Sequence, residues 1–214
     1  MKILLVLLSF LPGLKLAAQN APGSKQPDYI FFLHNKFLED QGLQGVHPEY
    51  GRTEYKEVIQ AFQKEGFTVI SEIRPKNTDV SAYAIKVVRQ IDSLLKKGIR
   101  PSHITVIGTS KGGYIAMAVS GLLKNPEVNF VFIGCCSLSE ASDPPEFNFC
   151  GHILSIYEKS DAVGRSCVSL KDKSANKVST FREIELNTGL KHGFLFRASM
   201  DWMQPSMQWA KKGS

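Results

Sequence analysis

The sequence predicts an α/β fold in which a mostly parallel central sheet carries helices on both faces, as a three-layer sandwich. Two observations lead to this fold class. Short, almost continuously apolar segments alternate along the chain with longer segments whose apolar residues recur every three or four positions. Strands that are apolar on both sides are typical of a parallel sheet, because helices cover both of its faces. The length of 214 residues suits one domain with a sizeable core.

The N-terminus precedes this alternation and differs from it in composition. Lys2 is followed by the apolar run ILLVLLSFLPGL, then by Lys15 and the small residues of LAAQNA. This order predicts a secretory signal peptide over residues 1–18, cut after Ala18; an uncleaved N-terminal anchor is the alternative. The run is shorter than the roughly 20 residues of a membrane span, so we expect no stable membrane insertion after cleavage. The mature protein is expected to be periplasmic or extracellular, with a short leader at 19–28 and a single domain at 29–214.

The first half of the domain alternates strands and helices. YIFFLH is short, rich in β-forming residues and ends in polar residues, which predicts a buried strand. The next helix repeats apolar residues at positions i, i+3, i+4 and i+7 from Tyr55 and ends at Gly66. In chain order the predicted elements are a strand at 29–34, an irregular stretch at 35–52, a helix at 55–66, a strand at 67–73, a helix at 81–97 and a strand at 103–108.

The second half continues the pattern without repeats or linkers. A helix from Gly112 to Lys124 stops at Asn125-Pro126, since proline cannot continue it. FVFIGC, HILSIYE and TFREIEL predict further strands at 130–135, 152–158 and 180–186. A last helix is expected at 205–211, with Trp202 and Trp209 available to pack it.

One serine stands among small residues where the strand at 103–108 passes into a helix. Gly108-Thr109-Ser110-Lys111-Gly112 follows the G-x-S-x-G pattern of a sharp turn that exposes a serine hydroxyl. The glycines remove side chains that would collide with backbone, and the helix N-terminus favours developing negative charge. Ser110 is therefore the predicted nucleophile. The structural alternative is a glycine-rich turn with an N-capping serine; a phosphate-binding loop would place lysine before serine.

A serine nucleophile needs a base and an acid that orients the base. In this type of fold the expected chain order is serine, acid, histidine. His192 follows the last strand, and the other histidines all precede the acid region, so His192 is the predicted base. Asp161 lies on a turn directly after a strand and is the predicted acid, with Glu158 and Asp172 as alternatives.

Attack on an acyl group produces an oxyanion, which needs two backbone N–H donors. The N–H of Lys111 is the first, because this residue follows the nucleophile. The second is expected from the loop after the first strand, in the segment LHNKFLE.

These residues complete a resemblance to the α/β-hydrolase superfamily that covers the chain from Tyr29 to about Trp209. The matching features are the loop at His34, the Ser110 turn, the Asp161 turn and His192-Gly193. In that superfamily the loop commonly reads His-Gly-x. Here Asn35 replaces the glycine, so the resemblance implies Lys36 as the second donor. It also implies a small, lidless, esterase-like enzyme with neither metal nor organic cofactor.

Three side chains in this region are expected to take no part in binding or catalysis. His34 is expected to be buried, and Arg74 to form an ion pair rather than bind a substrate carboxylate. Glu39 is expected to be solvated rather than to line the substrate entrance.

The cysteines and the net charge indicate which metals and macromolecules the protein is expected to bind. Four cysteines can pair in an exported protein. Cys135 and Cys136 are adjacent and rarely bond to each other, so one or both can reach Cys150 or Cys167; the connectivity stays open. The absence of a CxxC pair and of histidines at ligand spacing disfavours zinc. The net charge of +6, which becomes +4 without Lys2 and Lys15, is scattered, so no nucleic-acid partner is expected.

The sequence thus predicts an exported serine hydrolase that cleaves a small ester-like substrate through an acyl-enzyme on Ser110. A serine peptidase is one alternative, because GTSKGGY and HGF look like the prolyl-oligopeptidase group, although the propeller of that group has no room here. A thioesterase is chemically equivalent. A non-catalytic binding module on a hydrolase scaffold is the alternative of a different class.

Overall fold

The computed structural model describes residues 26–137 and 148–212. The predicted signal peptide and most of the leader lie outside the described residues, so their assignment stays a prediction.

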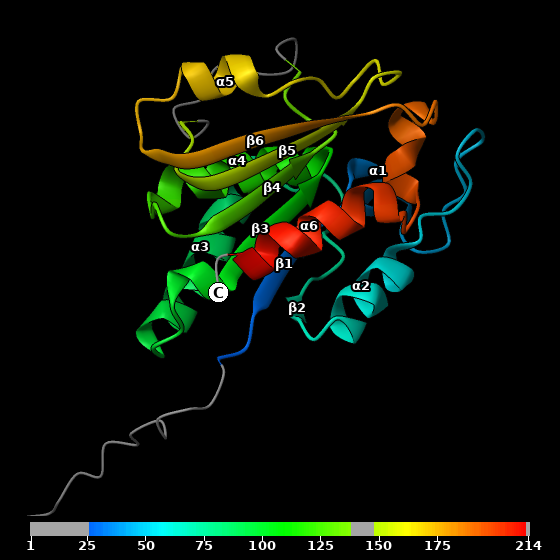
Figure 1. The fold of residues 1–214 in the computed structure, drawn as a ribbon. Helices are drawn as coiled ribbons and strands as arrows, with labels where there is room; N and C mark the ends of the chain where they lie inside the picture. Colours follow the sequence, from blue (N-terminus) through cyan, green and yellow to red (C-terminus); the bar gives the residue numbers. More distant parts are fainter. Residues whose placement is uncertain (1–25, 138–147, 213–214) are drawn as a thin grey trace, which may run out of the picture.

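Within the described residues, six parallel strands form one sheet in the order β2-β1-β3-β4-β5-β6 (Figure 1). The chain begins inside the sheet at β1, moves outward to β2, and crosses back to β3 before adding the remaining strands in sequence. Neighbouring connections therefore leave in opposite directions at β1 and β3, and α/β sheets bind ligands beside such a switch point, at the carboxyl ends of the strands. The strands are β1 (Tyr29–Leu33), β2 (Thr68–Ile70), β3 (Ile104–Thr109), β4 (Asn129–Ile133), β5 (Gly151–Glu158) and β6 (Val178–Leu186).

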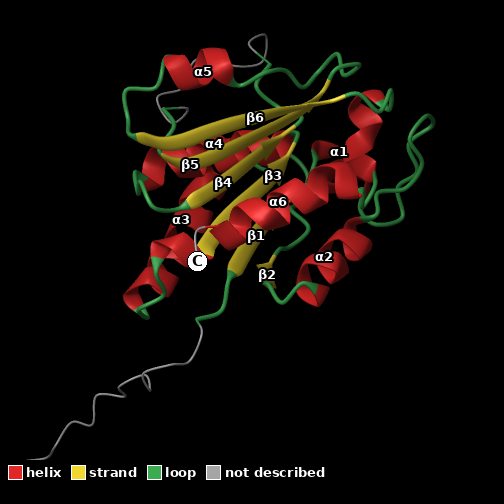
Figure 2. Cartoon of the chain, viewed as in Figure 1, coloured by secondary structure: helices red, strands yellow, loops and turns green. Residues whose placement is uncertain are grey.

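Helices cover both faces of the sheet, which confirms the predicted three-layer arrangement (Figure 2). One face packs against α3 and α4, and the other against α2 and α6, because successive strand residues point to opposite sides. Phe31 and Phe130 lie in the first cluster; Phe32 and Val131 lie in the second. The helices are α1 (Lys36–Gln41), α2 (Tyr55–Lys64), α3 (Val80–Lys96), α4 (Lys111–Leu123), α5 (Val168–Asp172) and α6 (Met200–Lys212), with 3₁₀ turns at Pro101–His103 and Lys191–Phe196.

Two predicted elements at the edge of the fold were wrong in extent. The stretch 35–52 is not irregular throughout, because Asn35 caps α1 by accepting a hydrogen bond from the Leu38 N–H at 3.0 Å. The strand predicted at 67–73 is only three residues long. Beyond β2 the hydroxyl of Ser71 donates to the Phe32 carbonyl at 2.6 Å, so a side chain replaces the backbone ladder there.

The last helix is longer than predicted, because it begins at Met200 and contains Pro205 in its interior. A proline removes one helical hydrogen bond and usually ends a helix. Here Ser199 binds the N–H of Asp201 through its hydroxyl at 3.2 Å and so starts the helix before the proline. The buried hydroxyl of Ser206 donates to the Trp202 carbonyl at 2.6 Å in the turn around Pro205. Trp202 is buried against the sheet and anchors this turn.

None of the helices within the described ranges combines the length and the apolar composition that crossing a lipid bilayer requires.

Candidate active site

Ser110 lies in a strained turn between β3 and α4. Its backbone has φ 50° and ψ −119°, values that a non-glycine residue rarely adopts. A side chain at Gly112 would overlap the Leu33 carbonyl, and one at Gly108 would overlap Gly112 itself. The glycines therefore let α4 begin directly against the end of β1. Ser110 makes no side-chain cap to the helix, which contradicts the capping-serine alternative.

The structure brings Ser110, His192 and Asp161 into one hydrogen-bonded line. His192 Nε2 lies 2.9 Å from Ser110 Oγ, and His192 Nδ1 lies 2.7 Å from Asp161 Oδ2. Because a carboxylate only accepts, Nδ1 carries the proton and Nε2 is free to accept the serine proton. Asp161 is buried, whereas Ser110 and His192 are partly exposed, so a ligand can reach the hydroxyl and the imidazole.

Neither of the alternative acids contacts His192 among the hydrogen bonds of the described residues. Asp172 ends α5 and forms an exposed ion pair with its neighbour Lys171. Glu158 is fully buried at the end of β5, but its carboxylate binds Ser160 and Thr188. Burial alone would raise the pKa of Glu158; the hydrogen bonds from Thr188 and Ser160 outweigh it and lower the pKa to about 2.

The loop after β1 approaches the Ser110 turn from the other side of the switch point. Asn35 has φ −70° and ψ 170°, an ordinary extended backbone, so this position does not require the conformational freedom of the glycine that the superfamily commonly has there. Lys36 is the first residue of α1, and Lys111 is the first residue of α4. The first N–H groups of a helix have no acceptor within the helix. The role of these two N–H groups as oxyanion donors stays a prediction.

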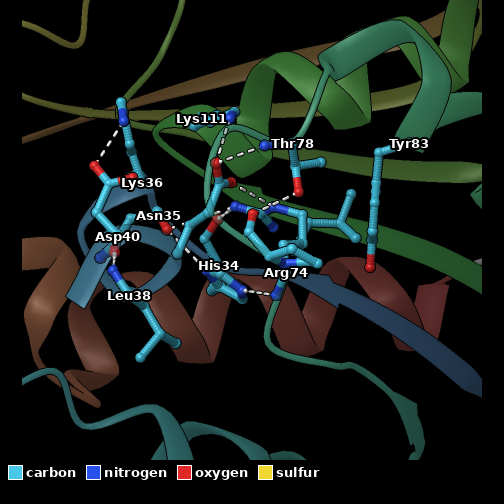
Figure 3. Close-up of polar contacts among 12 residues, drawn as sticks. His34, Asn35, Lys36, Leu38, Asp40, Arg74, Thr78, Tyr83 and Lys111 are labelled. Atoms are coloured by element: carbon cyan, nitrogen blue, oxygen red, sulfur yellow. Dashed lines mark hydrogen bonds and ion pairs between the residues drawn. The ribbon is translucent and has the colours of Figure 1, made fainter. Parts of the chain in front are cut away.

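A buried ion cluster joins the two helix starts (Figure 3). Glu39 Oε2 lies 3.0 Å from Arg74 Nε, and Glu39 Oε1 lies 2.5 Å from Lys111 Nζ. Burial opposes ionisation of Glu39, but the hydrogen bonds and charges of Lys111 and Arg74 hold its pKa below the ordinary value. The expectation of a solvated Glu39 was therefore wrong, whereas the structural ion pair of Arg74 is confirmed.

His34 lies next to Arg74 as a buried, neutral histidine, in agreement with its predicted structural role (Figure 3). Its Nε2 accepts the Arg74 N–H at 3.0 Å, so the protonated Nδ1 donates to the Asn35 carbonyl at 2.8 Å. Arg74 Nη2 also donates to the carbonyl of His34 at 2.5 Å. Burial and then the Arg74 charge lower the pKa of His34 to about 4.

The cysteines form one disulfide, between Cys136 and Cys167. It connects the segment after β4 to the start of α5, on either side of the Asp161 turn in sequence. Cys135 and Cys150 are free and buried. The sulfur atoms of Cys135, Cys136 and Cys167 lie within 4.8 Å of one another, but the disulfide consumes two of the three thiols that a metal would need.

A separate cavity of about 790 Å³ lies at the other end of the strands from Ser110, near the amino ends of β4, β5 and β6. Its lining includes Arg100, His152, Arg182 and Trp209 and none of the predicted site residues. The candidate active site is therefore defined by the side-chain geometry around Ser110 rather than by this cavity.

Comparison with known proteins supports the fold. No family model and no curated protein matches the sequence. A protein of unknown function from Agrobacterium tumefaciens, provisionally called an α/β hydrolase, matches with a TM-score of 0.59 at 18% identity, covering 89% of this chain and 87% of that chain.

Two further solved structures agree. SOBER1 from Arabidopsis thaliana matches with a TM-score of 0.58 at 15% identity, over 88% of this chain and 99% of that chain. A Klebsiella pneumoniae protein, provisionally called a dienelactone hydrolase, matches with a TM-score of 0.56 at 13% identity, over 89% of this chain and 90% of that chain. The chain has an α/β-hydrolase fold.

Proposed function

We propose that this protein is a serine hydrolase that cleaves an ester-like bond by acyl transfer. The observation that carries the proposal is the hydrogen-bonded line from Ser110 through His192 to the buried Asp161, at a strained turn of an α/β-hydrolase fold. Such a line gives a serine hydroxyl a base and gives that base an orienting acid.

In the proposed reaction Ser110 Oγ attacks the substrate carbonyl while His192 Nε2 takes the hydroxyl proton. Asp161 keeps the imidazole in the required tautomer and stabilises the imidazolium without taking a proton itself. The carbonyl oxygen becomes an oxyanion, which accepts hydrogen bonds from the N–H groups of Lys111 and Lys36. His192 then protonates the leaving alcohol. It next takes a proton from a water whose oxygen attacks the acyl carbon, and it returns that proton to Ser110 Oγ as the carboxylic acid leaves.

We further propose that the substrate is a small or exposed ester. Support comes from the chain near the triad. Only α5 stands between β5 and β6, and His192 itself lies in a 3₁₀ turn that a short link joins to α6. These short connections favour an open site.

Export is proposed on two grounds. The first 18 residues have the pattern of a signal peptide, and the Cys136–Cys167 disulfide suits an oxidising compartment. The measurement is the N-terminal sequence of protein recovered from outside the cytoplasm, which we expect to begin at Gln19. Recovery only in the cytoplasm, with Met1 or Lys2 at its N-terminus, would overturn export.

Activity is tested by labelling the purified protein with a fluorophosphonate, which reacts with activated serines. We expect labelling of the parent, none of Ser110→Ala and a reduction of at least 100-fold in rate for His192→Ala, because the base supplies about two to four orders of magnitude. Hydrolysis of p-nitrophenyl acetate should fall in parallel. A folded parent that neither reacts nor hydrolyses esters would refute the hydrolase and favour a binding module.

A further inference from the structure

Glu158 is a buried carboxylate that the proposed mechanism does not use. It ends β5, two residues before Ser160, and accepts from the Ser160 N–H at 3.1 Å and the Ser160 hydroxyl at 2.9 Å. Its other oxygen accepts from the Thr188 N–H at 2.9 Å and the Thr188 hydroxyl at 2.8 Å. A longer contact comes from the Gly189 N–H at 3.4 Å.

These donors belong to the two loops that carry the acid and the base. Ser160 directly precedes Asp161 in the loop after β5, whereas Thr188 lies in the loop after β6, four residues before His192. One carboxylate therefore binds both loops at once.

A second contact extends this connection to the residue before His192. The hydroxyl of Ser160 donates to Glu158 and accepts from the Lys191 N–H at 3.0 Å. The backbone of Lys191 has φ 51°, which is unfavourable for any residue other than glycine. This conformation therefore needs support from its surroundings. The hydrogen bonds from Glu158 through Ser160 supply that support immediately before the imidazole.

We propose that Glu158 is a positioning residue, whose carboxylate fixes the loop after β5 against the loop after β6 and thereby holds Asp161 and His192 at hydrogen-bonding distance. The proposal rests on the proposed function for its catalytic consequence. Glu158 itself touches neither the serine nor the imidazole in the described contacts. Its effect on catalysis therefore passes through the placement of the other two side chains.

The test compares Glu158→Gln with a matched control, Glu183→Gln. The glutamine keeps the shape of Glu158, but in either orientation its NH₂ group faces a backbone N–H that the carboxylate accepted. Glu183, on β6, accepts from the Ser166 hydroxyl at 2.6 Å and the Cys167 N–H at 2.8 Å, so it ties the far end of the loop after β5 to the sheet. None of its described hydrogen bonds reaches the His192 loop.

With p-nitrophenyl acetate we expect Glu158→Gln to lower kcat at least tenfold and to change KM less than twofold. The acid limb of the kcat/KM profile should move to lower pH, because a loosened Asp161 holds the imidazolium less well. Glu183→Gln should keep both the kcat and the limb of the parent. Equal kinetic effects of the two substitutions would overturn the proposal.

A readout that does not depend on activity separates this proposal from the hydrolase. In NMR spectra of ¹⁵N-histidine-labelled protein, the His192 Nδ1 proton should be protected from exchange in the parent and in Glu183→Gln, and should exchange rapidly in Glu158→Gln. An inactive parent with this pattern would refute the hydrolase but keep the positioning role. Unchanged protection in Glu158→Gln would refute the role whatever the activity.

Thr188→Val covers the case in which Glu158→Gln does not fold. This variant removes the hydroxyl that donates to Glu158 and accepts from the Leu190 N–H at 3.3 Å. It keeps the charge of Glu158, so any shift of the acid limb then reflects geometry alone. We expect a loss of several-fold in kcat and faster exchange of the imidazole proton. Values equal to those of the parent in both measurements would overturn the proposal.

Discussion

His34 is a buried imidazole whose ionisation opposes folding. Its pKa is lowered from 6.5 to about 4 in the folded protein, first by burial and then by the Arg74 charge. Between these pH values the unfolded chain binds more protons than the folded chain, so stability rises with pH. The contribution is complete above pH 6.5 and is lost as the pH falls toward about 4.

We therefore expect the free energy of unfolding to drop by roughly 3 kcal/mol between pH 6.5 and pH 4 because of this one group. Urea unfolding across this range measures the drop, and in His34→Gln, which cannot titrate, the pH dependence should be flatter by that amount. A variant whose pH dependence matches that of the parent would show that folding does not lower the pKa of His34.

The three residues of the proposed triad were predictable because each follows a strand and because their order along the chain is fixed by the fold. The buried carboxylates were not predictable. Glu39 pairs with Arg74, 35 residues away, and Glu158 binds Thr188, 30 residues away. From the local sequence, both look like ordinary solvent-exposed carboxylates. Only the tertiary fold supplies the cations and N–H groups that offset the free-energy cost of burying a charge.

At the scale of elements, α1 depends on its cap. It is only six residues long, and an isolated helix of that length is not stable in water. The Asn35 side chain satisfies one of its first N–H groups, and Leu38 and Glu39 bury its inner face. The cap should therefore contribute measurably to the stability of the loop that carries Lys36.

We expect Asn35→Ala to lower the free energy of unfolding by about 1 kcal/mol, because alanine cannot accept the Leu38 N–H. Asn35→Gly should cost only a few tenths of a kcal/mol, and Asn35→Asp, which can still accept, serves as the control. Urea midpoints of the three variants check this order. An alanine variant as stable as the parent would mean that the Asn35 side chain does not act as a cap.

The errors in element boundaries share one physical cause. At Asn35, Ser71 and Ser199, a polar side chain binds a backbone group that has no partner in the regular helix or strand. Such substitutions depend on where the chain turns in three dimensions. The apolar periodicity predicts where a strand or helix lies, but it does not contain these end contacts.

At the scale of the whole molecule, the alternation of strands and helices predicted the class and the layers. The order of strands needed the structure, because apolar runs alone do not say that β3 returns to pair with β1. That return opens the switch point between the two strands. The Ser110 turn and the His34 loop meet there, whereas the acid and the base arrive from β5 and β6.

The Cys136–Cys167 disulfide has a further consequence for the integrity of the chain. The bond closes a covalent ring over a sequence separation of 31 residues, and Asp161 lies within it. A protease that cuts the backbone once anywhere in that ring opens the ring without releasing a fragment. Such a nicked molecule would migrate as one species in a non-reducing denaturing gel and separate into two pieces only after reduction. Asp161 therefore stays covalently joined to the part of the chain that carries Ser110.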